Sequence, residues 1–396
     1  MSERLIKGSW LDEYIEYTRK QESPEIFHKW VGLSIVSAAL ERNVVLDMGA
    51  YKVYPNLYVI LVAGSAKCKK TTAMRIGRDL LKLLTKKVSI FAQKLTPEAL
   101  IQRLARRRKV RGKEVVQNST SLIYGAELAV FLGKERYNEG LIHLLTDLYD
   151  CPDEWEYETK HGGLEQLSNV LIGMLAGSAP KLLKGCLSID MIETGFPERI
   201  LFIYADTPRP PITRPTLPEF SRKKLLHDLN IIREMRGEFE WGTNAFEWYD
   251  EWYQKRFVSK DTPELLKGYL FRNHTTLLKV AILLCASERD DRVMQLPHLI
   301  KALELLKETE TYVYNAIRAI EESTKGSDLQ RIYDYIVRKG EVEEAVLLRT
   351  FSHMFTAKET REYLNSLRDS EMVKEYFKHV EGRKRQVTMY APMKVN

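Results

Sequence analysis

A glycine and a downstream lysine–threonine pair form the segment of this sequence best suited to bind phosphate. Gly64 is followed by five residues and then by Lys70 and Thr71. The backbone N–H groups of such a loop, with the start of a following helix, form a nest for phosphate oxygens. Lys70 would reach the β- and γ-phosphates, and Thr71 would hold Mg²⁺ through its hydroxyl. The segment predicts an ATP- and Mg²⁺-binding P-loop made of Gly64, Ser65, Ala66, Lys67, Cys68, Lys69, Lys70, Thr71 and Thr72.

One position departs from the P-loop pattern G-x-x-x-x-G-K-[ST]. Lys69 stands where the pattern has its second glycine, and that glycine often has a backbone conformation that is costly for other residues. The spacing alone is weak evidence, because a lysine-rich surface turn can also produce it. The context favours the P-loop, since the segment lies between an apolar run at 57–63 and a helical segment at 71–84.

A second candidate is the acid that closes a later apolar strand. Residues 121–126 resemble a Walker B strand, but Gly125 and Ala126 occupy the likeliest places for its aspartate. Glu127 then remains as the general base that orients or deprotonates the attacking water. The alternative is a surface glutamate stabilised by the dipole at the start of a helix.

Short apolar runs alternate with helical segments in the first half of the chain. The expected strands are 57–63, 88–91, 122–125, 170–175 and 200–205, and the expected helices between them include 71–84 and 96–108. Residues 1–43 have helical periodicity, and a helix there begins at Ser23-Pro24. The alternation predicts an α/β fold in three layers with a parallel sheet.

Changes in composition divide the rest of the chain. Residues 207–218 hold five prolines and predict a linker, and residues 222–323 have helical periodicity. A break at 324–328 precedes three helical segments and two strands, an order typical of a winged helix. We expect an N-terminal helical segment (1–50), a P-loop ATPase core (51–206), an all-helical domain (207–323) and a winged-helix domain (327–396).

Composition limits the compartment and the metals. The chain has no apolar stretch long enough for a bilayer and no signal-peptide core near its start, so we expect a cytoplasmic protein without membrane partners. Its four cysteines, Cys68, Cys151, Cys186 and Cys285, have no zinc-site spacing. Asp147 and Asp150 are secondary candidates for Mg²⁺ ligands.

Basic residues point to a polyanionic partner. The net charge is +7, and a first cluster comprises Arg103, Arg106, Arg107, Arg108, Lys109, Arg111 and Lys113. Such a density repels itself unless DNA or an acidic surface neutralises it. The solvated face of a helix is an equally good explanation for this cluster.

A second basic cluster lies in the expected winged helix. Its third helix carries Lys358, Arg361, Asn365 and Arg368, and the tip of its hairpin carries Arg383, Lys384 and Arg385. We expect these residues to contact DNA phosphates. Winged helices also mediate protein contacts, and Glu359 and Glu362 on the same helix fit that alternative.

Several short motifs follow one another in a specific order. They are Ser23-Pro-Glu-Ile-Phe, Tyr54-Pro-Asn-Leu-Tyr, Leu95-Thr-Pro-Glu-Ala-Leu, Glu127-Leu with Phe131-Leu, Leu145-Thr-Asp-Leu-Tyr-Asp, Trp155-Glu-Tyr-Glu-Thr-Lys, Gly177-Ser-Ala-Pro and Gly195-Phe-Pro-Glu-Arg. Over roughly residues 23–206, the chain thereby resembles the RecA-like P-loop ATPases of phages, plasmids and other mobile elements, which are often replication helicases or primase–helicases.

The resemblance implies two further roles. Ser178 occupies the place of a polar residue that senses the γ-phosphate, although a helix N-cap before Pro180 explains it equally well. Arg199 is the best candidate for an arginine that stabilises transition-state charge, in its own chain or in a neighbouring subunit. A structural salt bridge is the alternative for Arg199. The resemblance also implies a homo-oligomer on DNA, such as a hexameric ring, with a primase as a possible partner in the cell or host of the element.

Three functions remain open at this point. The leading hypothesis is an ATP-driven DNA helicase or translocase of a mobile element. The second is an ATP-switched DNA-binding protein or helicase loader without unwinding activity, which the departures at Lys69 and in the Walker B strand favour. The third is a small-molecule phosphotransferase, against which the long helical region and the winged helix argue.

Overall fold

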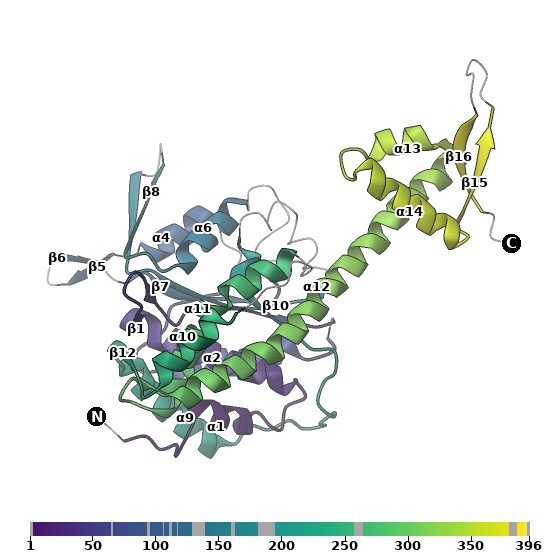
Figure 1. Ribbon diagram of the computed structural model, residues 1–396. Coiled ribbons are helices and arrows are strands. Elements are labelled where there is room, and N and C mark those ends of the chain that lie inside the picture. Colours follow the sequence, from purple (N-terminus) through teal and green to yellow (C-terminus); the bar gives the residue numbers. More distant parts are fainter. Residues whose placement is uncertain are drawn as a thin grey trace. The chain divides into compact units, whose positions relative to one another are not determined.

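The structure is a computed structural model (Figure 1). It describes the backbone of residues 3–64, 66–92, 96–105, 107–110, 113–116, 118–128, 139–159, 163–180, 195–256, 264–379 and 386–393. The chain divides into two compact units, Met1–Ile317 and Arg318–Asn396. The boundary between them falls within one helix, α12 (Leu296–Lys339).

A five-stranded parallel sheet forms the centre of the first unit. Its strands are β3 (Tyr58–Val62), β4 (Ile90–Phe91), β7 (Thr120–Gly125), β10 (Leu171–Ser178) and β11 (Ile200–Tyr204), in the spatial order β11-β3-β10-β7-β4. These are the five expected strands, so the α/β fold with a parallel sheet is confirmed. Every residue of β3 and of β10 is buried, as expected where both faces of a parallel sheet are covered.

Helices accompany the sheets of the first unit. They include α1 (Trp10–Tyr17), α2 (Glu25–Leu40), α3 (Lys70–Leu83), α4 (Pro97–Leu104), α6 (Glu139–Tyr149), α9 (Glu219–Glu234), α10 (Ala245–Gln254) and α11 (Glu264–Glu288). Of these, α3, α4 and α6 lie in the connections between strands of the central sheet. The helix α3 packs closely on α2 at Gly77, where an added Cβ would lie 2.5 Å from Val31 Cγ1. None of the described helices is both long and apolar enough to cross a membrane.

A second sheet was not expected from the sequence. Its strands, in the order β13-β12-β1-β2, are β13 (Val293–Met294), β12 (Gly237–Trp241), β1 (Val44–Asp47) and β2 (Lys52–Val53). The expectation of an all-helical region at 207–323 is therefore wrong at β12 and β13. The reason is that β12 pairs with β1, far away in the sequence, and β13 in turn pairs with β12. Local periodicity does not report such long-range pairing.

Two antiparallel hairpins were also not predicted from the sequence. They are β5 (Arg107–Val110) with β6 (Lys113–Val116), and β8 (Glu154–Thr159) with β9 (Gly163–Ser168). The helix expected at 96–108 ends at Leu104. The first basic cluster is therefore carried largely by a β-hairpin, and its interpretation as one face of a helix is wrong.

The proline-rich segment 207–218 is irregular but firmly attached. Arg209 N donates to Glu22 O at 2.8 Å, and Gln21 Nε2 donates to Thr216 O at 2.9 Å. Segments expected as three separate domains, 1–50, 51–206 and most of 207–323, share one compact unit. The segment 207–218 is thus part of that unit rather than a free linker between two domains.

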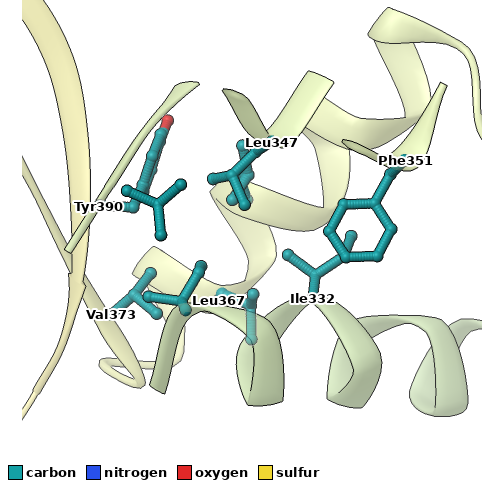
Figure 2. Packing of buried hydrophobic residues seen from close by; sticks show 9 residues of the cluster. Ile332, Leu347, Phe351, Leu367, Val373 and Tyr390 are labelled. Carbon is teal, nitrogen blue, oxygen red and sulfur yellow. The ribbon is translucent and has the colours of Figure 1, made fainter. Parts of the chain in front are cut away.

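The second unit combines three helical segments with a small antiparallel sheet. After the end of α12 come β14 (Val342–Glu343), α13 (Glu344–Phe351), α14 (Ala357–Asp369), β15 (Val373–Lys378) and β16 (Val387–Pro392), with sheet order β14-β16-β15. Figure 2 shows its own apolar core, in which side chains from α12, α13, α14 and the sheet converge: Ile332, Leu347, Phe351, Leu367, Val373 and Tyr390. The predicted order of helices and hairpin is present.

The start of this unit differs from the prediction. A break was expected at 324–328, but α12 continues through those residues. One glycine in a helix costs only about 1 kcal/mol relative to alanine, which is too little to break a helix of this length by itself. Gly326 therefore does not end α12.

Candidate functional site

The loop between β3 and α3 lies at the carboxyl edge of the parallel sheet. Lys69 adopts the left-handed conformation, with φ 48° and ψ 36°, and Ala66 has φ 60°. A residue with a Cβ pays roughly 1–2 kcal/mol for this conformation. The position where the P-loop pattern has glycine thus has a glycine-like backbone, although a lysine occupies it. Ser65 lies outside the described residues.

The start of α3 has no side-chain cap among the described residues. Thr72 N and Ala73 N donate to Lys69 O at 3.0 and 3.2 Å, so the amides suited to a phosphate are those that come before them in the first turn. Cys68 is buried, and its thiol donates to Ala205 O at 3.5 Å. Burial raises the pKa of the Cys68 thiol. Cys68 therefore anchors the loop on the strand edge, so its expected contribution to ATP binding would come from its backbone.

Lys70 reaches back across its own loop. Its Nζ donates to Ala63 O at 2.7 Å and lies 3.4 Å from Gly64 O. Burial lowers the pKa of Lys70, and the negative charge of Glu127 opposes that effect. The ammonium group is thus held at the mouth of the loop, near a carboxylate from another strand.

Glu127 and Ser178 meet beside Lys70. Ser178 ends β10 and is fully buried, and its Oγ donates to Glu127 Oε1 at 3.0 Å. The end of β10 also passes close to Lys70, since a Cβ added at Gly177 would lie 3.7 Å from Lys70 Cε. Because β10 lies between β3 and β7, three neighbouring strands bring these three predicted residues to one place.

The two threonines after Lys70 lie in the first turn of α3. Thr71 is exposed and Thr72 is partly exposed. Within the described ranges, no group of three or more His, Cys, Asp and Glu side chains could hold a metal ion. A Mg²⁺ bound with a nucleotide needs fewer protein ligands, because phosphate oxygens and water supply the others. The hydroxyl of Thr71 therefore stays the predicted Mg²⁺ ligand.

Arg199 lies at the opposite edge of the sheet. It precedes β11, whose first residue, Ile200, pairs with the first residue of β3. At about 3.3 Å per residue, the length of β11 separates Arg199 from the level of the loop by about 16 Å. Its guanidinium donates to Gly195 O and to Asp150 Oδ2, both at 2.9 Å. The salt bridge considered for Arg199 is present, and the structure does not bring Arg199 to Lys70 of its own chain.

The two aspartates proposed as secondary Mg²⁺ ligands lie away from Thr71. Asp150 pairs with Arg199 at the amino edge of the sheet. Asp147 is exposed in the last turn of α6, and its carbonyl accepts from Asp150 N at 3.4 Å. The interpretation of both residues as Mg²⁺ ligands is wrong, because α6 returns the chain to the amino edge before β10 begins.

The expected DNA-contacting residues are only partly visible. Arg106, Arg111, Arg383, Lys384 and Arg385, and the side chains of Arg107, Arg108, Lys109 and Lys113, lie outside the described residues. On α14, Lys358 and Arg361 are exposed. Arg361 Nε donates to Glu344 Oε1 at 2.7 Å, and Arg368 pairs with Asp369 and Glu375. Two basic side chains of α14 thus already have acidic partners.

A groove beside the loop was missed by the sequence interpretation. Its volume is about 600 Å³, and its lining includes Glu22, Lys69, Thr72, Arg75, Thr213 and Pro215. It joins the start of α3 to the proline-rich segment 207–218. The prolines in this segment could have indicated the groove. Proline restricts φ, so a proline-rich segment is better suited to form a rigid wall than a flexible linker.

No protein-family model matches the chain, and a search of curated proteins found no match.

Proposed function

We propose that the first unit binds ATP with Mg²⁺ at the loop between β3 and α3 and hydrolyses it. One observation carries the proposal: Lys70, Glu127 and Ser178 converge at the carboxyl edge of a parallel sheet. Ligands of open α/β sheets bind at this edge. An ammonium group, a carboxylate and uncapped helix amides together provide what phosphoryl transfer to water requires.

Each group has a distinct task in this proposal. Lys70 exchanges its bonds to the carbonyls of Ala63 and Gly64 for phosphate oxygens, which are stronger acceptors because they are charged. Thr71 supplies a hydroxyl to Mg²⁺. Ser178 occupies Glu127 Oε1, so the other carboxylate oxygen is left to orient the attacking water and accept its proton. Ser178 is thus a positioning residue for the base and lies where a γ-phosphate would be sensed.

The groove beside the loop suits the nucleoside. It shares Lys69 and Thr72 with the predicted phosphate site, and the base and ribose must lie next to the phosphates. Ile212 N is held by Glu22 Oε1 at 3.1 Å, which fixes one wall of the groove. ATP would therefore extend from the start of α3 toward the segment 207–218.

The second unit is the proposed winged-helix domain, which binds DNA through charge. Together, the two units support a RecA-like ATP-driven DNA motor, such as a replicative helicase or translocase of a mobile element. In such a motor a homo-oligomeric ring would bring Arg199 to a neighbouring subunit. The support consists of the sheet, the convergence of three site residues, and the helix and hairpin order of the second unit.

An ATP-switched DNA-binding protein or helicase loader is the second candidate. It is favoured by the site itself, because Gly125 and Ala126 replace the usual acid and Glu127 is the carboxylate that contacts Ser178. A site with one carboxylate holds Mg²⁺ less firmly, so binding without fast turnover is the expected behaviour of a switch.

Two assays separate the candidates. Steady-state ATP hydrolysis is measured with and without single-stranded DNA, and strand displacement on a forked duplex follows. A motor hydrolyses ATP faster with DNA and separates the strands. A switch binds ATP and DNA but displaces no strand, and absence of ATP binding rejects both candidates.

A further inference from the structure

A buried lysine lies far from the loop, at the amino edge of the central sheet. Lys279, on α11, is 4% exposed. Its Nζ donates to Asn56 Oδ1 at 2.7 Å and lies 3.8 Å from the centre of the Tyr149 ring. Within the described part of the chain, no carboxylate forms an ion pair with Lys279. An ammonium group has three N–H donors, so this charge is incompletely satisfied.

Asn56 fixes the position of that ammonium group. The side chain of Asn56 is fully buried, and its Nδ2 donates to Tyr149 O at 2.8 Å and to Ile172 O at 3.3 Å. These two bonds turn Oδ1 toward Lys279. The hydrogen bond of Lys279 therefore ends on a side chain that two further hydrogen bonds hold in place.

Lys279 lines a cavity of about 230 Å³ that other donors share. Arg272, Thr275 and Tyr54 are among its lining residues. The hydroxyl of Tyr54 accepts from Arg42 Nη2 at 3.0 Å, which leaves its own O–H to donate. The wall of the cavity therefore offers an ammonium group, a guanidinium and hydroxyl groups.

The acid in the same wall is already compensated. Asp150 lines the cavity, but its carboxylate has two basic partners. Arg199 Nη2 lies 2.9 Å from Asp150 Oδ2, and Arg272 Nη1 lies 3.7 Å from Asp150 Oδ1. Arg272 also lies 3.5 Å from Glu198. These two acids are thus matched by the two arginines, and Lys279, which contacts an amide oxygen and an aromatic ring, has no carboxylate partner among the described residues.

We propose that this cavity binds a phosphate-class oxyanion, with Lys279 as its central ligand. A buried ammonium is costly unless a partner compensates it, and an oxyanion in the cavity would supply that partner. The anion is either free in solution or the terminal phosphate of a nucleic acid. The site is separate from the β3–α3 loop, because the cavity residue Asn56 precedes β3 whereas the loop follows it.

The test uses the full chain with Lys70→Ala, so that phosphate binding at the β3–α3 loop is weakened. Inorganic phosphate is titrated by calorimetry against this protein. Lys279→Gln in the same background should bind phosphate at least about tenfold more weakly, since a hydrogen bond to a charged group contributes about 1.5–3 kcal/mol. Arg272→Gln, which is partly exposed and so tolerates exchange, should weaken binding in the same direction.

Lys301→Gln is the matched control, because Lys301 pairs with Asp12 on the surface; it should leave phosphate binding unchanged. Absence of phosphate binding by the Lys70→Ala protein would overturn the proposal. Equal binding by that protein and by both cavity variants would overturn it as well. ATP hydrolysis is not the readout, so the result is independent of the function proposed above.

A second titration identifies the source of the anion. Two oligonucleotides of one sequence are compared, with and without a 5′-phosphate. Tighter binding of the phosphorylated strand that is lost in Lys279→Gln assigns the site to a nucleic-acid end. Equal binding of both strands, together with Lys279-dependent binding of inorganic phosphate, assigns it to a free anion.

Discussion

Ser178 Oγ donates a 3.0 Å hydrogen bond to Glu127 Oε1, across the carboxyl ends of the neighbouring strands β10 and β7. The serine is fully buried and the bond is partly buried, so the bond orients a carboxylate that is still reached by solvent. Glu127 lies at the mouth of the loop, where its charge acts on Lys70. This pair fixes the geometry on which the first prediction depends.

Glu127→Gln should bind ATP and fail to cleave it. The amide keeps the size of the side chain and can still accept from Ser178, but it cannot take a proton from water. General-base catalysis is worth about 10²–10⁴-fold, so turnover should fall by that factor while ATP binding is retained. The control is Glu98→Gln, at an exposed acid in the first turn of α4. Hydrolysis within a few-fold of the original rate would show that the base lies elsewhere.

Lys70→Ala should abolish ATP hydrolysis and leave the fold intact. The ammonium is the positive side chain that the loop places beside Glu127, whereas its structural bonds go to only two carbonyl groups. Turnover and far-ultraviolet circular dichroism are measured on the same sample. Normal turnover in a well-folded Lys70→Ala protein would mean that the loop is not the phosphate site.

Substitutions of Lys69 test whether the left-handed backbone conformation at this position limits which residues the loop accepts. Its φ of 48° is tolerated by glycine and strongly disfavoured for β-branched residues. Lys69→Gly should change the free energy of unfolding by less than about 1 kcal/mol, because relief of strain and the added freedom of the unfolded chain oppose each other. Lys69→Val should lower stability by more than that.

The matched control for Lys69→Val is Lys67→Val. Lys67 is exposed in the same loop and is not among the residues with positive φ. Denaturant unfolding is measured for the three variants and the original protein. Equal losses from both valine variants would show that the left-handed conformation of Lys69 is not what limits substitution.

The sequence was sufficient for the central sheet and for part of the site. The strands and the loop were predictable because each depends on local signals: an apolar run, a glycine and a helix start. Lys70, Glu127 and Ser178 could be proposed one by one, but their proximity depends on the place of β10 between β3 and β7. Strand order is a property of long-range pairing, which local patterns do not report.

The same limit explains what was missed. The pairing of β12 with β1 and the position of Arg199 beside Asp150 both join segments that are far apart in the chain. The sequence alone gives no reason to single out Lys279, because a lysine in a helix is ordinarily exposed. Its burial shows only when α11 is packed against Asn56 and Tyr149.

Arg199 should act in hydrolysis across a subunit boundary, since Lys70 of the same chain lies at the other edge of the sheet. Arg199→Ala and Lys70→Ala proteins should each be inactive alone. Mixing them should restore some activity, because mixed assemblies contain interfaces with an intact Lys70 and an intact Arg199. The control mixes Lys70→Ala with Glu127→Gln, which both damage the loop side of the site and should restore nothing.

The assembly state decides the same question independently. Sedimentation is measured with ATP and DNA at the concentration of the assay. A strictly monomeric protein would contradict the role of Arg199 between subunits. Its bonds to Asp150 and Gly195 O would then be its function, and Arg199→Ala would act only by lowering stability.

The second unit should bind nucleic acid through charge. Residues Arg318–Asn396 form a compact unit with its own apolar core, so this fragment should fold alone. Contacts to phosphate by about three basic residues give a slope near −3 for log affinity against log salt on duplex DNA. The proposed residues are Arg383, Lys384 and Arg385, and salt titration of fragment binding measures the slope.

Reversing these three residues to glutamate should weaken binding strongly and roughly equally on different DNA sequences, because backbone contacts carry no base information. ATP turnover without DNA should hardly change, since Lys70, Glu127 and Ser178 belong to the first unit. Arg361→Glu is the informative comparison: Arg361 is already paired with Glu344, so its reversal should weaken DNA binding less than reversal of a hairpin-tip residue. A fragment without DNA affinity even at low salt would identify the unit as a protein-docking module. DNA binding would then depend on the β5–β6 hairpin and its basic cluster.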